Sequence, residues 1–240
     1  MKLTFIGTRA YIPHSSKEHQ YDASCIISHR ATHVLIDCGT KLLGQLKKIK
    51  PIPQAVVLTH AHLDHVEGLK KGCIWPVYGT KETLLFIKNY PLRQRHVIKS
   101  RHSFSIGDIT FEAFRVEHSI DEPAVGYRIT AGNKSIFYVP DLVFIRQRKA
   151  ALKGVTAYIG DGARIMYPLI RKKGTRQMGH GAFAKQLAWC CKERVQWAIV
   201  THCGSEIVTK PQQARQKFDA LSKRYGVKVT IAHDGMVIEV

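Results

Sequence analysis

The segment His60-Ala61-His62-Leu63-Asp64-His65 concentrates residue types that bind metal ions. Metals require unprotonated imidazole or carboxylate donors that are held close together. The apolar run before the segment predicts a strand, and a strand end presents His60 and His62 on one side because they are two residues apart. A turn into a helix then brings Asp64 and His65 toward a second ion. Since burial of so many titratable groups without a metal is costly, the segment predicts a metal site.

The same segment resembles the HxHxDH signature of the metallo-β-lactamase superfamily. That family continues with a lone His, an Asp and another His, each of which follows a strand. The chain supplies them in this order as His118, Asp141 and His202. The resemblance covers nearly the whole chain, including Ala232-His233-Asp234-Gly235-Met236 before the last predicted strand.

Residue type and spacing alone predict only a polynuclear His/Asp site, and the resemblance implies how the ligands divide. The first metal takes His60, His62 and His118, the second takes Asp64, His65 and His202, and Asp141 bridges both. Two adjacent cations activate a water molecule near neutral pH and polarise a phosphoryl or carbonyl oxygen of the substrate. Asp64 is assigned a catalytic role besides its ligand role. The cofactors expected are two divalent ions, with Zn²⁺ the best match to these donors and Mn²⁺ or Fe as alternatives.

Two further features resemble the RNase Z and PhnP-like phosphodiesterase branch. His65 is shared with phosphodiesterases and thioesterases, whereas many true β-lactamases carry another residue there. In RNase Z a His at the start of a comparable helix assists the chemistry, and His180 matches it; Gly179 would let the backbone approach the site. The alternative is that His180 only caps its own helical turn. His233 is expected either to hydrogen-bond the substrate or to brace the metal ligands.

The sequence lacks one accessory element of each branch. RNase Z proper carries an inserted arm that grips tRNA, and the 240 residues show no long insertion of that kind. PhnP-like enzymes carry an additional zinc site with cysteines. The six cysteines of this chain include no CxxC pair, so a separate zinc knuckle is not expected.

The charge indicates a polyanionic partner. Lys and Arg number 37 against 18 acidic residues, which gives a net charge of +19, and nucleic acid is the first candidate. The segments Lys88–His102 and Arg164–Arg176 combine basic and aromatic residues, a combination typical of single-strand binding. A solvated basic face is the alternative interpretation. Arg171, Lys172 and Lys173 are the residues expected to contact the substrate.

Alternating short β-rich runs and amphipathic stretches must position these residues. The expected strands are Leu3–Ile6, Ala23–Ser28, His33–Asp37, Ala55–Leu58, Val77–Tyr78, Ile109–Glu117, Val125–Thr130, Ser135–Val139, Ala157–Ile159, Trp197–Val200, Lys228–Ala232 and Met236–Glu239. The expected helices are Lys41–Lys48, Asp64–Lys70, Lys81–Lys88, His180–Arg194 and Pro211–Tyr225. The pattern predicts one α/β domain over residues 1–240. Its expected architecture is the four-layer αβ/βα sandwich of the metallo-β-lactamase fold, with two mixed sheets and helices outside.

The combined reading predicts a metal-dependent hydrolase, in first place a phosphodiesterase that acts on nucleic acid. The alternatives are a phosphodiesterase of small cyclic or linear phosphodiesters, a glyoxalase-II-like thioesterase and, last, a nucleic-acid-binding module without activity. The sequence contains no run of about 18 apolar residues, so no transmembrane helix is expected. The first residues form too short an apolar run for a signal peptide, so a cytoplasmic location without membrane contact is expected. A homodimer is compatible with the sequence.

Overall fold

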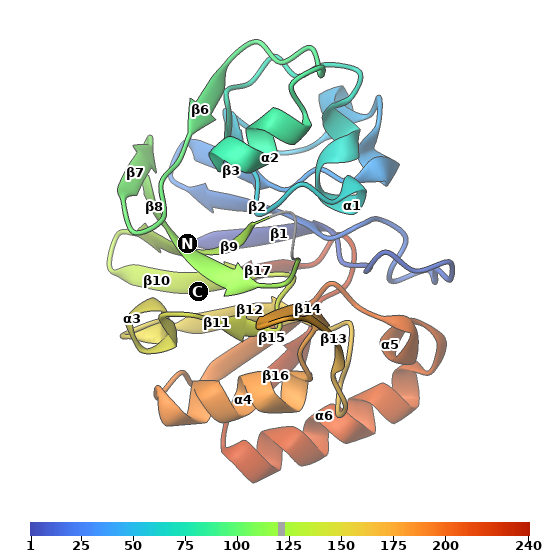
Figure 1. The fold of residues 1–240 in the computed structure, drawn as a ribbon. Coiled ribbons are helices and arrows are strands. Elements are labelled where there is room, and N and C mark those ends of the chain that lie inside the picture. The colour runs from blue at the N-terminus through green and yellow to red at the C-terminus, as the bar shows by residue number, and fades with distance from the viewer. Residues whose placement is uncertain (120–122) are drawn as a thin grey trace.

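Two β-sheets packed face to face form the centre of the molecule, and helices cover their outer faces (Figure 1). The computed structural model describes residues 1–119 and 123–240. The first sheet has seven strands in the order β17 (Val237–Glu239), β1 (Lys2–Gly7), β2 (Ser24–His29), β3 (Thr32–Ile36), β4 (Ala55–Val57), β5 (Val77–Gly79) and β6 (Arg95–Val97). Pairing is antiparallel from β17 to β3 and parallel from β3 to β6.

The second sheet is mixed in the same way. Its order is β11 (Phe144–Ile145), β8 (Ile109–Glu117), β9 (Ala124–Ala131), β10 (Lys134–Val139), β12 (Ala157–Asp161), β15 (Trp197–Thr201) and β16 (Lys228–Ile231), with β7 (Ser103–Ile106) beside β8. The antiparallel pair of β9 and β10 turns at Gly132-Asn133, as the turn signal predicts. A separate hairpin joins β13 (Leu169–Lys173) and β14 (Arg176–His180).

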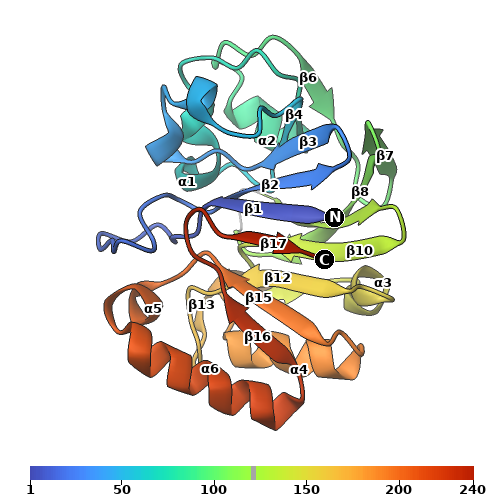
Figure 2. The same cartoon turned by 180° about the vertical axis from the view of Figure 1, so that it is seen from behind.

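Helices lie on both outer faces (Figures 1 and 2). The first sheet is covered by α1 (Leu63–Val66) and α2 (Lys81–Phe86), with the 3₁₀ turns Thr40–Leu42, Leu46–Lys48 and Glu67–Leu69. The second is covered by α3 (Arg148–Leu152), α4 (Phe183–Lys192), α5 (Ser205–Thr209) and α6 (Pro211–Tyr225). In the described part of the chain, no helix has the length and apolar character that crossing a membrane requires.

Three apolar clusters follow from the two-residue periodicity of the strands. In β10, Ile136 and Tyr138 join the cluster between the sheets, whereas Phe137 and Val139 join the cluster that packs under α4 and α6. A third cluster, with Val56 and Leu84, fills the space between the first sheet and its helices. Because a strand that is buried on both faces must be apolar throughout, β10 and its neighbours carry near-continuous hydrophobic runs.

The observed elements confirm the expected αβ/βα sandwich and all of the expected strands, with ends shifted by a residue or two. The expected helix Lys41–Lys48 is wrong: the segment forms two 3₁₀ turns, because Gly44 between them has a φ of +74°. The expected helix His180–Arg194 starts only at Phe183. His180 instead ends β14, so it does not cap a helical turn.

Candidate metal centre

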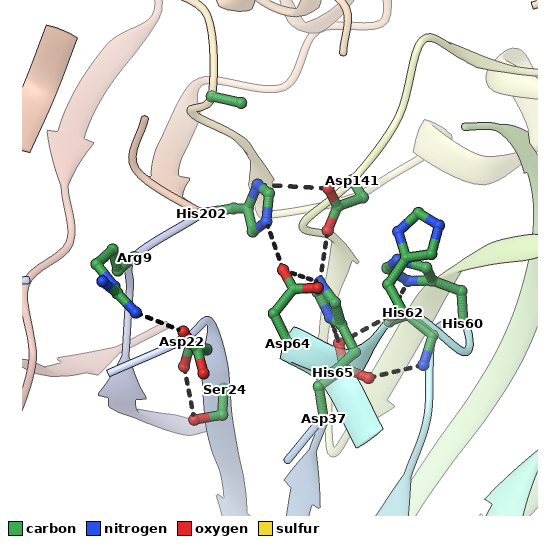
Figure 3. Close-up of polar contacts among 12 residues, drawn as sticks. Arg9, Asp22, Ser24, Asp37, His60, His62, Asp64, His65, Asp141 and His202 are labelled. Atoms are coloured by element: carbon green, nitrogen blue, oxygen red, sulfur yellow. Dashed lines mark hydrogen bonds and ion pairs between the residues drawn. The ribbon is translucent and has the colours of Figure 1, made fainter. Parts of the chain in front are cut away.

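The candidate ligands meet at the edge where several strands end. His60 and His62 follow β4 in the first sheet, while His118, Asp141 and His202 follow β8, β10 and β15 in the second. Strands β10, β12 and β15 are mutually parallel, so their carboxyl ends lie at one edge. Figure 3 shows six of the candidate ligands pointing toward one another from these elements. The sequence-predicted residues are therefore brought together from both sheets.

His60, His62 and His118 form one group whose ligand atoms all lie within 4.8 Å of one another. Nε2 of His118 lies 3.1 Å from Nδ1 of His62. His118 donates through Nδ1 to the carbonyl oxygen of Gly179 at 3.0 Å, which leaves Nε2 for the centre of the group. Three imidazole nitrogens that face a common point match the ligand set expected of the first metal.

Asp64, His65 and His202 form a second such group. Oδ2 of Asp64 lies 3.2 Å from Nε2 of His65 and 3.3 Å from Nε2 of His202. Asp141 lies between the two groups: its carboxylate is 2.9 Å from Nε2 of His65 and 3.8 Å from Nε2 of His118. This is the location that a bridging ligand would need.

Asp37 holds one histidine of each group from behind. Its Oδ2 accepts hydrogen bonds from Nδ1 of His65 at 2.9 Å and from Oγ1 of Thr59 at 2.8 Å. Oγ1 of Thr59 lies 3.0 Å from Nδ1 of His60 and accepts its proton, since its own hydrogen is donated to Asp37. Both rings thereby keep Nε2 for the centre. Such supporting hydrogen bonds fix the tautomer and the orientation of metal-binding imidazoles.

The pKa shifts of the candidate ligands differ between the two groups. Burial lowers the pKa of His60 well below its usual range and that of His118 to about 4. Burial also lowers the pKa of His202, but Asp141, Asp161 and Asp64 outweigh it and raise the pKa to about 10. Burial raises the pKa of Asp141, yet His202, His118 and His65 hold it well below the usual carboxyl range. His60 and His118 thus offer neutral imidazoles, and the second group surrounds its carboxylates with positive charge, the charge that a metal ion would bring.

Unsatisfied atoms at the centre test whether a metal fits. Nε2 of His60, Nε2 of His65, Oδ2 of Asp141 and Nδ1 of His202 are buried, and none has a hydrogen bond of acceptable geometry. Buried polar atoms normally have a partner, because leaving one without costs about 1–3 kcal/mol. Here the atoms approach each other closely without the angles of hydrogen bonds, as lone pairs do when they are directed at a common ion. The donor set therefore fits divalent metal binding.

His180 and Asp161 extend the cluster toward the cavity. Nδ1 of His180 lies 2.8 Å from Oδ2 of Asp161 and 3.4 Å from Oδ1 of Asp141. The ligand atoms of Asp141, Asp161, His180 and His202 also satisfy the 4.8 Å spacing, so distance alone does not separate a ligand role from a supporting one. Asp161 already accepts hydrogen bonds from the backbone N–H groups of Leu142 and Ala163. Because both of its oxygens are engaged, Asp161 is better suited to orienting His180 than to binding an ion.

A cavity of about 660 Å³ opens over the cluster and is lined by His62, Asp64, His118, Asp141, His180 and His202. The β13–β14 hairpin forms one wall through Leu169, Arg171 and Met178. Gly179 anchors the hairpin, since its N–H donates to the carbonyl of His118 at 2.8 Å. Its φ is +112°, and a Cβ there would lie 2.1 Å from the carbonyl oxygen of Leu169, so the hairpin requires glycine at this position.

The residues expected to contact the substrate lie on two different faces of this hairpin. Cross-strand partners share a face, and the pair Arg171–Met178 lines the cavity. By the strand register, the pair Lys173–Arg176 lies on the same face of the hairpin, beyond the cavity lining. Lys172 lies between Arg171 and Lys173 in β13 and therefore points to the opposite face. The expectation that Lys172 contacts the substrate beside Arg171 is thus not supported by the register.

His233 lies outside this cavity. It is exposed, its Nδ1 contacts the carbonyl oxygen of Asp234, and it lines a different cavity with His19 and Arg215. Neither of the two roles expected of His233 is supported, because the final turn directs its side chain away from the metal cluster. The basic segment Lys88–His102 contributes no residue to the lining of this cavity, and its strand β6 lies at the opposite side of the molecule from β13 (Figures 1 and 2).

Asp37 and Asp161 are the site residues that the sequence reasoning missed. Each ends an apolar strand, as Asp37 follows Val34–Ile36 and Asp161 follows Ala157–Gly160. This is the same signal that identified Asp141 after β10. A search for every aspartate at the carboxyl end of an apolar strand would have found both.

Comparison with known proteins identifies the family. The family described as "Beta-lactamase superfamily domain" matches residues 32–203. A ribonuclease Z of Methanopyrus kandleri is 27% identical over 176 residues, which cover 65% of this chain and 61% of the relative. An exodeoxyribonuclease YycJ of Bacillus anthracis is 26% identical over 161 residues, 64% of this chain and 57% of the relative. The matches to these curated relatives thus span about three fifths of the relatives' length.

Solved structures share the fold. The metallo-β-lactamase fold protein YhfI of Bacillus subtilis superposes with a TM-score of 0.80 at 18% identity and covers 100% of this chain and 98% of its own. A diphosphatase of the PhnP family gives 0.74 at 20% identity, with 100% and 96% covered. The short form of human tRNase Z gives 0.69 at 19% identity, with 100% and 99% covered. The likeness to these structures shows the fold, and the ribonuclease Z among the sequence relatives agrees with the resemblance to the RNase Z branch.

Proposed function

The chain belongs to the β-lactamase superfamily, and from this premise we propose that it is a metal-dependent phosphodiesterase that cleaves nucleic acid. The proposal rests on one observation: the candidate metal ligands and a basic hairpin line the same cavity. The floor holds the two groups of candidate ligands, and the wall is the basic β13–β14 hairpin. The nuclease names of the curated relatives support the same substrate class.

The residues assigned to the metals are His60, His62 and His118 for one ion, Asp64, His65 and His202 for the other, and Asp141 for both. When bound, two divalent ions, for which zinc is the best match, would activate a water molecule and stabilise charge that develops on the phosphoryl oxygens. No serine or cysteine nucleophile is then needed. Asp64 would act through the ligand that it supplies to the second ion.

His180 is assigned the transfer of a proton to the departing oxygen. Asp161 accepts the Nδ1 proton of His180, so Nε2 is the nitrogen that remains for the cavity. Burial lowers the pKa of His180, but Asp161 and Asp141 outweigh it and raise the pKa above the usual histidine value. A protonated imidazole next to the reacting phosphate can act as a general acid. Asp161 serves as the residue that orients it.

The hairpin is assigned the contact with phosphates outside the reacting centre. Arg171 and Lys173 are two residues apart in β13, roughly 6–7 Å along the strand. Within residues 1–119 and 123–240, no carboxylate forms an ion pair with either of them. In contrast, Arg101 of the remote basic segment is paired with Glu112 at 2.6 Å. Free positive charge beside the metals favours a polyanion over a single small phosphodiester.

A small cyclic or linear phosphodiester is the second candidate, favoured by the structural similarity to the PhnP-family diphosphatase. The test is an activity screen of the metal-loaded protein on single-stranded RNA, single-stranded DNA, cyclic nucleotides and a thioester. Elemental analysis of the same preparation should find about two ions per chain. Cleavage of oligonucleotides with higher kcat/KM than of cyclic nucleotides supports the proposal. The absence of oligonucleotide cleavage under every metal tested would refute it, and thioester turnover alone would replace it.

A further inference from the structure

Three exposed apolar side chains line the metal cavity. Tyr11 is 69% exposed, Leu63 is 42% exposed and Leu169 is 50% exposed, and all three line the cavity that contains the candidate ligands. They come from three separate segments: the loop after β1, the start of α1 and the start of β13. An apolar surface that is assembled from distant segments at a cleft is a common sign of a ligand-binding site.

Each of these side chains is tied to a residue of the reacting centre. Leu63 stands between His62 and Asp64 in the chain. Leu169 is the cross-strand partner of His180. The segment of Tyr11 is joined to the residue after His202, because the N–H of Ala10 donates to the carbonyl of Cys203 at 3.0 Å. A group that rests on these side chains would therefore share the cavity with the candidate ligands.

The backbone around Tyr11 is fixed although its side chain is exposed. The N–H of Ile12 donates to the carbonyl of Ala10 at 2.8 Å, so Tyr11 is the central residue of a tight turn. The guanidinium of Arg9, itself almost buried, donates to the carbonyls of Ile12 at 3.0 Å and His14 at 3.4 Å. It also forms an ion pair with buried Asp22 at 2.9 Å, beside the cluster (Figure 3). The loop thus holds an aromatic ring in the lining of the cavity.

We propose that Tyr11, Leu63 and Leu169 form a subsite for the nucleobase adjacent to the cleaved phosphate. This inference rests on the proposed function and adds to it the part of the substrate that the metals and the hairpin do not contact. Nucleobases are flat and aromatic, and they stack on tyrosine rings whatever their sequence. Leu63 and Leu169, which line the same cavity, would add apolar contact without demanding particular hydrogen bonds. The subsite therefore accepts any base and rejects a phosphodiester that lacks one.

The test compares binding of AMP and ribose 5-phosphate, two ligands that differ by the base alone. Titration calorimetry of metal-loaded and metal-free protein gives the ratio of the two Kd values without relying on turnover. Stacking on one aromatic ring is worth about 1–3 kcal/mol per base, so wild type should bind AMP on the order of tenfold more tightly. Tyr11→Ala should remove most of that preference, and Tyr11→Phe should retain it.

Phe86→Ala is the matched control, because Phe86 is 51% exposed in α2 and does not line the metal cavity. Equal Kd values for the two ligands in wild type, or no AMP binding at millimolar concentration, would overturn the subsite. An equal loss for both ligands in Tyr11→Ala would also overturn it, since that result indicates a general role of the loop. Failure of the proposed function would look different: AMP preference would persist while no phosphodiester is hydrolysed.

Discussion

Because the β13–β14 hairpin has two faces, substitutions of neighbouring basic residues should affect nucleic-acid binding differently. Arg171 and Lys173 share the face that lines the metal cavity, whereas Lys172 points away from it. The double variant Arg171→Gln/Lys173→Gln should weaken binding of single-stranded RNA or DNA. The single variant Lys172→Gln should leave binding nearly unchanged, although it removes a charge from the same strand.

The expected magnitude follows from counterion release. Each phosphate contact on a single strand contributes about 0.7 to the slope of log K against log salt. Loss of two contacts should therefore flatten the slope by about 1.4. Because general charge acts over a Debye length of about 10 Å at moderate salt, Lys172→Gln should lower affinity slightly at low salt and hardly change the slope.

Fluorescence anisotropy of a labelled oligonucleotide across a salt series measures both quantities. Hydrolysis of a small chromogenic phosphodiester serves as a second readout and should change much less than oligonucleotide cleavage. An equal effect of Lys172→Gln on the slope would show that only net charge matters. An unchanged slope in the double variant would remove the hairpin from the nucleic-acid contact.

Three further expectations concern the metal centre. Asp141→Ala should lose metal and activity together, whereas Asp108→Ala, a change at an exposed aspartate, should lose neither; normal metal content in the first variant would remove Asp141 from the site. Asp37→Asn should lower metal affinity by roughly 10- to 100-fold, measured by competition with a chelator, since its amide NH2 would face either the backbone N–H of Thr59 or the side-chain donors of Thr59 and His65. His180→Ala should lower turnover by roughly 10²–10⁴-fold with metals retained. A fall in melting temperature with unchanged turnover would instead assign His180 a structural role.

The contiguous part of the site could be predicted from the sequence, because its metal-binding residue types stand close together in the chain. His60, His62, Asp64 and His65 follow one apolar strand, and no packing information is needed to group them. The strands were predictable for the same reason, as β8 alternates buried apolar residues with polar ones and β10 ends in the apolar run Ile136–Val139. Asp37 and Asp161 were not found, since a lone aspartate after a strand also fits an ordinary turn.

The hairpin shows where sequence patterns stop being informative. Its residues Leu169–Lys173 and Arg176–His180 are mainly basic or polar, with two glycines nearby, so no two-residue alternation predicts strands. The hairpin is held by tertiary contacts instead, above all by the hydrogen bonds between Gly179 and His118. The face that each lysine occupies depends on that register, because a shift of one residue would exchange Lys172 with its neighbours.

Asp37 and Asp161 make the same kind of hydrogen bond to two histidines to which we assign different roles. Each aspartate stands at the end of a strand, one in each sheet, and accepts the Nδ1 proton of a histidine, His65 for Asp37 and His180 for Asp161. In His65 the remaining nitrogen, Nε2, is buried 2.9 Å from Asp141, where a metal ion would satisfy both groups. The side chain of His180 stays 22% exposed and lines the cavity, so its remaining nitrogen is accessible to a substrate. The assignment of one histidine to a metal and the other to proton transfer therefore follows from burial, because residue type and supporting carboxylate are the same in both.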